Sequence, residues 1–167
     1  HGWASATFFT GIIWSTTDGG IHWRVGAAIH AVNAMHFVDS NTGWVVGVPP
    51  TLGSGGPISR TVDGGRSWTN QATTLDAELY GVDFTTSRRG FAVGRHGLIL
   101  ATTDGGSTWV RRPVPAEFAD TFFLGVEAVG GVGVWVVGQN GTILFSKHET
   151  GRFPEPGEVL DLIPAAP

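Results

Sequence analysis

An eight-residue motif recurs three times at nearly regular intervals, and this repeat limits the possible folds more than any other feature of the sequence. The motif has the form T-x-D-G-G-x-x-W, and its copies begin at Thr16, Thr61 and Thr102. Their tryptophans are separated by 45 and 41 residues, and a weaker fourth copy ends 44 residues later at Phe153. A period in the low forties is typical of the blades of a β-propeller.

Short β-rich runs surround each copy of the motif. Glycine-bounded runs lie at 2–6, 43–47, 90–94 and 134–138. Other runs lie at 32–37, 79–84 and 124–128, and the segments that lead into the motifs are 12–15, 58–60, 98–101 and 143–145. Each unit thus supplies three strands and a further strand after the motif, with no helical periodicity. We predict an all-β, β-propeller-type fold with about four four-stranded blades.

The repeats divide residues 1–153 into four units, followed by a tail of different composition. The expected bounds of the units are about 1–29, 30–76, 77–120 and 121–153. The tail, 154–167, contains four of the nine prolines and three acidic residues but no basic residue. We expect it to be extended and to cover a blade edge. The chain opens at His1 with neither a starting methionine nor a signal peptide, which suggests a mature or truncated chain.

The motif itself has a local structural explanation. An aspartate side chain can accept hydrogen bonds from the backbone of its own turn, and paired glycines permit positive φ angles. Equivalent aspartates on successive blades cannot converge on one substrate, so we interpret them as structural rather than catalytic. The residues given this structural role are Asp18, Trp23, Asp63, Trp68, Asp104 and Trp109.

The motifs resemble the Asp-box, or BNR, repeat. The longer unit that combines a strand ending at Phe37, the element Ser40-x-x-Gly43-Trp44-x-Val46-Gly47 and a following Asp-box resembles repeats of the photosystem II stability/assembly factor family. The resemblance covers residues 1 to about 153. It implies a seven-bladed propeller in the thylakoid lumen or periplasm that binds reaction-centre proteins and is not an enzyme.

The length of the chain departs from that family pattern. A ring of seven blades needs roughly three hundred residues at this period, whereas the chain has 167 and begins in the middle of a unit. Three alternatives follow: a fragment of a larger propeller, a closed four-bladed ring, or an open array of blades against a partner. We slightly favour the closed ring, in which a strand from the far end of the chain would complete the first blade.

Loops that the repeat does not require are the best candidates for binding a protein partner. The second unit inserts a Pro-Pro and Gly/Ser segment, the first unit places an aromatic pair in the equivalent loop, and the third unit adds basic residues. The candidate partner-binding residues are Phe8, Phe9, Pro49, Pro50, Leu52, Arg95, His96, Arg111 and Arg112. The two phenylalanines are about equally suited to packing in the core.

An enzymatic function receives little support from the residues. A sialidase requires a tyrosine nucleophile, but the only tyrosine, Tyr80, lies in an ordinary strand position, and the family's F-R-I-P motif is absent. A xyloglucanase-type glycosidase requires two carboxylates across a cleft. Asp83 and Glu127 are the only strand carboxylates outside the motifs, and their equivalent positions in two units favour a structural role.

Composition excludes several other classes of function. The chain has no cysteine and its six histidines are scattered, so we expect no metal site and no cofactor. Charged residues make up 14% of the chain, with a net charge of -4, and nucleic acid is therefore an unsuitable partner. No apolar run approaches the length of a membrane span. The dipeptide Asn140-Gly141 matches a glycosylation acceptor, but we interpret it as a hairpin turn.

Together these features predict a non-catalytic scaffold: an assembly factor or structural subunit of a membrane-associated photosynthetic complex, whose partners are protein subunits. The alternative is an extracellular glycan-binding or glycoside-hydrolase-like Asp-box propeller. We expect a periplasmic or thylakoid-lumenal location, with membrane association through partners or through an anchor that precedes His1.

Overall fold

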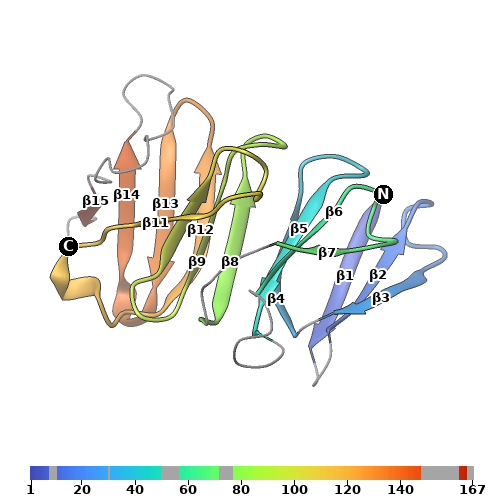
Figure 1. Ribbon diagram of the computed structural model, residues 1–167, viewed down its shortest axis with the longest axis horizontal. Coiled ribbons are helices and arrows are strands. Elements are labelled where there is room, and N and C mark those ends of the chain that lie inside the picture. The colour runs from blue at the N-terminus through green and yellow to red at the C-terminus, as the bar shows by residue number, and fades with distance from the viewer. Residues whose placement is uncertain (8–10, 30, 50–56, 72–76, 148–161, 165–167) are drawn as a thin grey trace. The chain divides into compact units, whose positions relative to one another are not determined.

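The computed structural model describes residues 1–7, 11–29, 31–49, 57–71, 77–147 and 162–164. Its chain separates into two compact units, His1–Glu78 and Leu79–Pro167. Among the described residues, four antiparallel sheets account for every strand. In each sheet, every strand is hydrogen-bonded to the next strand along the chain (Figure 1), which is the meander of a propeller blade. The predicted β-propeller-type fold is confirmed.

The first unit contains two blades. Blade 1 consists of β1 (Gly2–Thr7), β2 (Gly11–Thr16) and β3 (Arg24–Ile29). Blade 2 consists of β4 (Val32–Phe37), β5 (Gly43–Gly47), β6 (Ile58–Thr61) and β7 (Thr69–Asn70).

The second unit contains two further blades. Blade 3 consists of β8 (Leu79–Phe84), β9 (Gly90–Gly94), β10 (Ile99–Thr102) and β11 (Val110–Arg112). Blade 4 consists of β12 (Phe123–Val129), β13 (Gly133–Gly138), β14 (Ile143–Lys147) and β15 (Leu162–Pro164). The described residues of this unit also form two short 3-10 turns, η1 (Ala116–Phe118) and η2 (Gln139–Gly141).

The tail strand β15 is the fourth strand of blade 4. It pairs antiparallel with β14 through Leu144 opposite Pro164 and Ser146 opposite Leu162. The predicted edge-covering role is therefore confirmed for Leu162–Pro164. The expectation that the far end of the chain supplies the missing strand of blade 1 stays a prediction, because residues 148–161 and 165–167 lie outside the described residues.

A phenylalanine–glycine pair explains the glycine that opens the second strand of blades 2 and 3. Phe37 lies opposite Gly43, and Phe84 lies opposite Gly90, in the strand registers. A Cβ atom added to Gly43 would lie 2.4 Å from the ring of Phe37, and one added to Gly90 would lie 2.5 Å from the ring of Phe84. The ring occupies the space of the missing side chain, so larger residues are excluded at this position.

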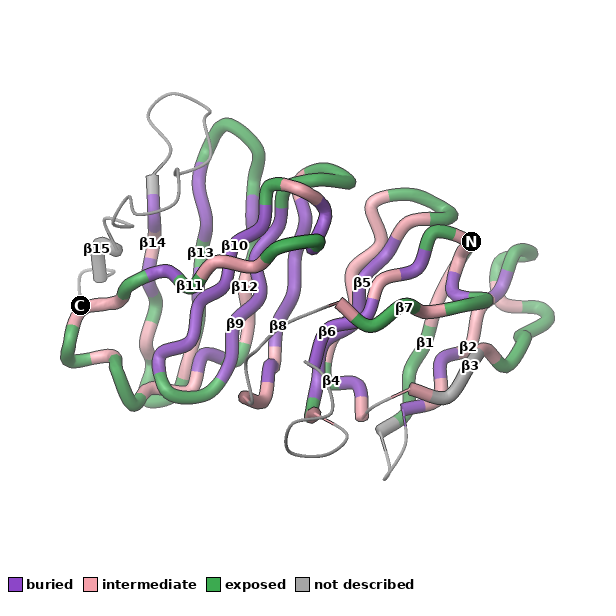
Figure 2. The backbone as a smooth tube through the Cα atoms, viewed as in Figure 1, coloured by how far each residue is buried: buried purple, intermediate pink, exposed green. Residues whose placement is uncertain are grey.

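The core of the second unit lies between blades 3 and 4. Alternate residues of β9 and β10 pack against alternate residues of β12, β13 and β14. The main contributors are Phe91, Val93, Ile99, Val134, Val136 and Leu144. Figure 2 shows β9 as buried along its length, and all five of its residues are buried. In the first unit, Ile13, Val32 and Val45 form a smaller buried cluster between blades 1 and 2.

The other face of blade 4 is exposed. Trp135 and Val137 occupy the strand positions that Phe91 and Val93 occupy in blade 3, since each pair lies opposite equivalent residues of the following strand. Phe91 is 0% exposed, but Trp135 is 41% exposed and stacks on Phe145 with ring centroids 4.2 Å apart. Equivalent sequence positions therefore differ in burial because only blade 3 is followed by another blade within the unit.

The hairpin turns follow their sequence signals. Asn140 (φ 57, ψ 31) and Gly141 (φ 72) both adopt left-handed backbone angles between β13 and β14. His96 (φ 54) and Gly97 (φ 60) form the equivalent turn between β9 and β10. The prediction that Asn140-Gly141 is a turn is confirmed, because these angles suit asparagine and glycine.

Candidate functional site

The three Asp-box turns share one hydrogen-bond pattern. In the second turn, Thr61 Oγ1 donates to Asp63 Oδ1 (2.8 Å) and accepts from the backbone nitrogen of Gly65 (2.9 Å). Asp63 Oδ1 also accepts from the backbone nitrogen of Ser67 (2.9 Å), and Asp63 Oδ2 accepts from Ser67 Oγ (2.6 Å). The turns that contain Asp18 and Asp104 repeat these contacts at nearly the same distances.

These contacts hold the motif aspartates in the ionised state. Hydrogen bonds from the backbone of His22 and the hydroxyl of Thr16 lower the pKa of Asp18 to about 2. The hydroxyl and backbone of Ser67 lower the pKa of Asp63 to about 2. For Asp104, burial acts to raise the pKa, but hydrogen bonds from Thr108 outweigh it and the pKa is lowered. Each carboxylate therefore accepts its hydrogen bonds from residues of its own turn.

The motif tryptophans cover the hairpins to different extents. Trp68 packs edge-on against Phe37 at 6.0 Å, and Trp109 packs edge-on against Phe84 at 5.8 Å. Trp23 is 46% exposed, and its Nε1 donates to the carbonyl oxygen of Gly20 at 3.1 Å. These two phenylalanines are the same residues whose rings pack against the strand glycines described above. Each of these two tryptophans therefore packs against a strand of its own blade.

A cation–aromatic cluster in the second unit is the candidate functional site. Its centre is the ring of Phe122, which is half-buried. The guanidinium carbon of Arg95 lies 4.8 Å from the Phe122 ring centroid, and His96 packs edge-on against the same ring at 5.8 Å. Tyr80 stacks on Phe122 with centroids 6.3 Å apart. We refer to these residues, with Arg111, as the Phe122 cluster.

Local backbone geometry positions each member of the Phe122 cluster. A register shift between Leu79 and Gly81 leaves Tyr80 in a bulge, and bulges redirect side chains. Arg95 and His96 lie in the tight turn between β9 and β10. Arg111 Nη2 donates to the backbone oxygen of His96 at 3.4 Å. His96 Nδ1 lies 3.8 Å from Asp120 Oδ1, and both side chains are largely exposed.

The sequence predicted part of this cluster. Arg95, His96 and Arg111 were expected at a binding face; the structure places Arg95 and His96 against one ring and joins Arg111 to His96 by a hydrogen bond. Phe122 and Tyr80 were not expected there. The signal for Phe122 was the pair Phe122-Phe123: strand alternation buries Phe123 at 0% exposure and directs its neighbour outward.

Most of the other predicted partner-binding residues are not described by the structure. Phe8, Phe9, Pro50 and Leu52 lie outside the described residues, and Pro49 is half-buried in the first unit. Arg112 is 2% exposed, and its burial argues against the predicted partner contact. The cause is the alternation of β11, in which Arg111 points outward and Arg112 inward.

The two strand carboxylates have different environments. Asp83 is 6% exposed, and its Oδ2 accepts a hydrogen bond from the backbone nitrogen of Ala128 at 2.6 Å. Glu127 is exposed. Asp83 thus ties β8 to β12. No group of metal-binding residues occurs among the described residues.

The fold and its turns define the class of this chain, an Asp-box repeat protein of the β-propeller type. The family model of the photosynthesis system II assembly factor YCF48 matches residues 65–155, more than half of the chain. The chain belongs to this family, as its repeats predicted.

Curated relatives are similar over less than half of the chain. A photosystem II assembly lipoprotein Ycf48 from Synechococcus sp. (strain RCC307) is 30% identical over 76 residues, covering 44% of this chain and 23% of the relative. The protein of the same name from Synechococcus sp. (strain CC9902) is 34% identical over 81 residues, covering 46% of this chain and 22% of the relative. The match thus spans less than a quarter of the length of these relatives.

Solved structures share the fold at low identity. YCF48 from Cyanidioschyzon merolae has a TM-score of 0.65 at 15% identity, covering 97% of this chain and 53% of that chain. YCF48 bound to D1 peptide has a TM-score of 0.61 at 23% identity, covering 90% and 42%. A GH74 enzyme from Niastella koreensis has a TM-score of 0.61 at 17% identity, covering 87% and 26%. These identities establish the fold alone.

Proposed function

We propose that this chain is a non-catalytic protein-binding module that acts in photosystem II assembly by binding a reaction-centre subunit. Its family membership supports this function, as do the names of the curated relatives. A family structure described as bound to D1 peptide supports a peptide segment as the ligand. The matched region covers less than a quarter of those relatives.

The Phe122 cluster is the observation that carries the proposal. Arginine and aromatic residues are the types enriched at protein interfaces. The guanidinium groups of Arg95 and Arg111 can donate to carboxylate and carbonyl oxygens of a peptide. The rings of Phe122 and Tyr80 provide apolar surface beside these donors. The cluster also lies within the region that matches the family model.

The glycosidase alternative receives less support. An inverting glycosidase needs two carboxylates that face each other across a substrate. Asp83 instead accepts a hydrogen bond from the backbone of the neighbouring strand, while Glu127 is exposed. The GH74 neighbours share the fold at 15% and 17% identity, which carries no catalytic residue over to this chain.

The proposed location is the periplasmic or thylakoid-lumenal side of the membrane. The curated relatives are named lipoproteins, which supports membrane association through a lipid anchor or through partners. Within the described part of the chain, no helix has the length and apolar character needed to cross a membrane.

Calorimetric titration with the D1 peptide of the solved family complex tests this function. We expect saturable binding by the chain and about tenfold weaker binding by the double variant Arg95→Gln/Arg111→Gln, since each change removes a charged donor. Phe122→Ala should weaken binding as well. The matched control is Arg88→Gln/Arg89→Gln, which removes the same two charges from exposed positions of the same unit.

Two outcomes would overturn the proposal. One is the absence of D1-peptide binding by the unmodified chain. The other is an equal loss of binding in Arg88→Gln/Arg89→Gln, which would indicate that binding depends on general surface charge. A parallel assay with xyloglucan tests the alternative glycosidase function. If the chain releases reducing ends and this activity is lost in both Asp83→Asn and Glu127→Gln, the chain is a glycosidase instead.

A further inference from the structure

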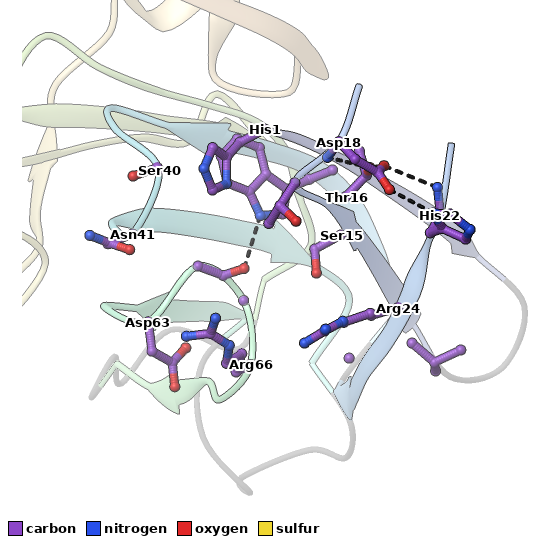
Figure 3. Close-up of a pocket in the computed structure, with 16 residues that line it drawn as sticks. His1, Ser15, Thr16, Asp18, His22, Arg24, Ser40, Asn41, Asp63 and Arg66 are labelled. Atoms are coloured by element: carbon purple, nitrogen blue, oxygen red, sulfur yellow. Dashed lines mark hydrogen bonds and ion pairs between the residues drawn. The ribbon is translucent and has the colours of Figure 1, made fainter. Parts of the chain in front are cut away.

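A polar pocket of about 520 Å³ lies in the first unit, between the Asp-box turns of blades 1 and 2 (Figure 3). One wall is formed by the end of β2, the first Asp-box turn and the start of β3. The opposite wall is formed by the loop between β4 and β5 and by the second Asp-box turn. None of these residues belongs to the Phe122 cluster.

Hydrogen bonds and close packing hold the walls of this pocket in place. Trp3 Nε1 donates to the carbonyl oxygen of Gly64 at 3.0 Å, which connects blade 1 to the second turn. The backbone nitrogen of Gly64 donates to the carbonyl oxygen of Asn41 at 2.8 Å, which connects that turn to its own blade. At Gly26, an added Cβ would lie 2.9 Å from the oxygen of Gly65. The pocket is therefore preformed, as ligand sites commonly are.

Two arginines line the pocket at positions that the repeat leaves variable. Figure 3 shows Arg24 extending from β3 toward the second turn, where Arg66 lies. Ile21 takes the place of Arg66 in the first motif, and Ser107 takes it in the third. Within the part of the chain that the structure describes, neither guanidinium makes a hydrogen bond or ion pair. The turn geometry does not need these arginines, and both side chains are exposed and line the pocket.

The motif aspartates limit the kind of anion that the pocket can hold. Asp18 and Asp63 also line it, but their oxygens accept hydrogen bonds from their own turns. Their charges remain nearby and would repel a polyanion such as a phosphate ester. A single planar carboxylate matches the guanidinium fork and carries one negative charge. Val25, which is 70% exposed, adds an apolar contact at the rim.

We propose that this pocket binds a carboxylate side chain of an acidic protein segment through Arg24 and Arg66. The site is separate from the Phe122 cluster, because its residues come from the first unit. The inference therefore does not depend on the proposed function, and either can fail without the other. It gives the chain a peptide-binding position of its own at the end of the blades where the Asp-box turns lie.

Titration with a blocked hexapeptide of alternating alanine and glutamate tests the site. The design uses residues that the repeat already accepts: Arg24→Thr copies Thr69, and Arg66→Ser copies Ser107. We expect the double variant to bind the peptide about tenfold more weakly than the unmodified chain. A peptide with glutamine in place of glutamate should bind no better than that variant. Unchanged thermal melting and circular dichroism would establish that the variant is folded.

Each remaining outcome would overturn the proposal. If the double variant and the unmodified chain bound the peptide with equal affinity, the two arginines would not be its binding residues. Equal affinity of the glutamine peptide would exclude carboxylate recognition. A loss of binding in Arg95→Gln/Arg111→Gln but not in Arg24→Thr/Arg66→Ser would place the acidic peptide on the Phe122 cluster. Displacement of the peptide by lower concentrations of inorganic phosphate than of acetate would indicate a phosphate site.

Discussion

The carboxylate of Asp83 accepts a hydrogen bond from the backbone nitrogen of Ala128 at 2.6 Å, across two adjacent strands of neighbouring blades. Both residues are buried. In blade 4, Glu127 has the same strand register as Asp83 in blade 3, since each lies opposite the aromatic residue of the next strand. The carboxylate is thus a structural connection in one blade and a surface group in the other.

Replacement of Asp83 by alanine should therefore destabilise the chain. The change leaves the buried nitrogen of Ala128 without its acceptor, which costs about 1–3 kcal/mol in the free energy of unfolding. Urea denaturation followed by tryptophan fluorescence measures this loss. Glu127→Ala is the matched control and should change the free energy of unfolding by no more than about 0.5 kcal/mol, as at other surface positions. Equal effects of the two changes would contradict the structural role of Asp83.

The Asp-box carboxylates predict a loss of stability in acid. The pKa of Asp18 and of Asp63 falls from 3.8 to about 2 in the folded chain. At a pH between these two values, the unfolded chain binds more protons than the folded chain. The stabilisation that the ionised carboxylates provide is therefore complete above the pKa of the unfolded chain, and it is lost as the pH falls toward the pKa of the folded chain. The urea concentration at the midpoint of unfolding should therefore decrease as the pH is lowered from about 5 to about 2.5, a range that covers most of the interval between the two pKa values. In the double variant Asp18→Asn/Asp63→Asn, the midpoint should decrease less steeply with falling pH. A decrease as steep as that of the unmodified chain would contradict the assignment of the acid sensitivity to these two carboxylates.

Two equivalent aromatic positions should differ in their sensitivity to truncation. Phe91 is completely buried between blades 3 and 4, and its replacement by alanine should cost about 3–5 kcal/mol in the free energy of unfolding. Trp135 is 41% exposed and mainly contacts Phe145, so Trp135→Ala should cost about 1 kcal/mol. Chemical denaturation of the two variants checks the difference. Similar losses would show that the exposed face of blade 4 is covered in solution.

The glycine of the phenylalanine–glycine pair should not tolerate a methyl group. In Gly90→Ala, the new Cβ would lie 2.5 Å from the ring of Phe84, and relieving this overlap should cost about 1–3 kcal/mol. Gly130→Ala is the control, since the nearest atom to its Cβ would be 4.0 Å away. Thermal unfolding of both variants measures the contrast. A melting temperature of Gly90→Ala equal to that of the control would contradict the close packing.

The sequence alone determined the features that arise within a few residues. The Asp-box turns depend on contacts such as that from Ser67 to Asp63, four residues apart, and so the motif predicts its own geometry. The strands that lead into each turn, and the turn at Asn140-Gly141, follow from the same local preferences. Because the local device recurs at a regular period, the repeated sheets and the family could both be predicted.

Only the tertiary structure decided which of these repeated positions are buried. Arg111 and Arg112 are adjacent and chemically identical, yet only Arg111 reaches the surface. The ring of Phe122 gathers Arg95 and Tyr80 from distant parts of the chain, and β15 pairs with β14. Burial and such contacts depend on the neighbouring blade, which local sequence does not encode. Equivalent residues such as Asp83 and Glu127 therefore acquire different roles.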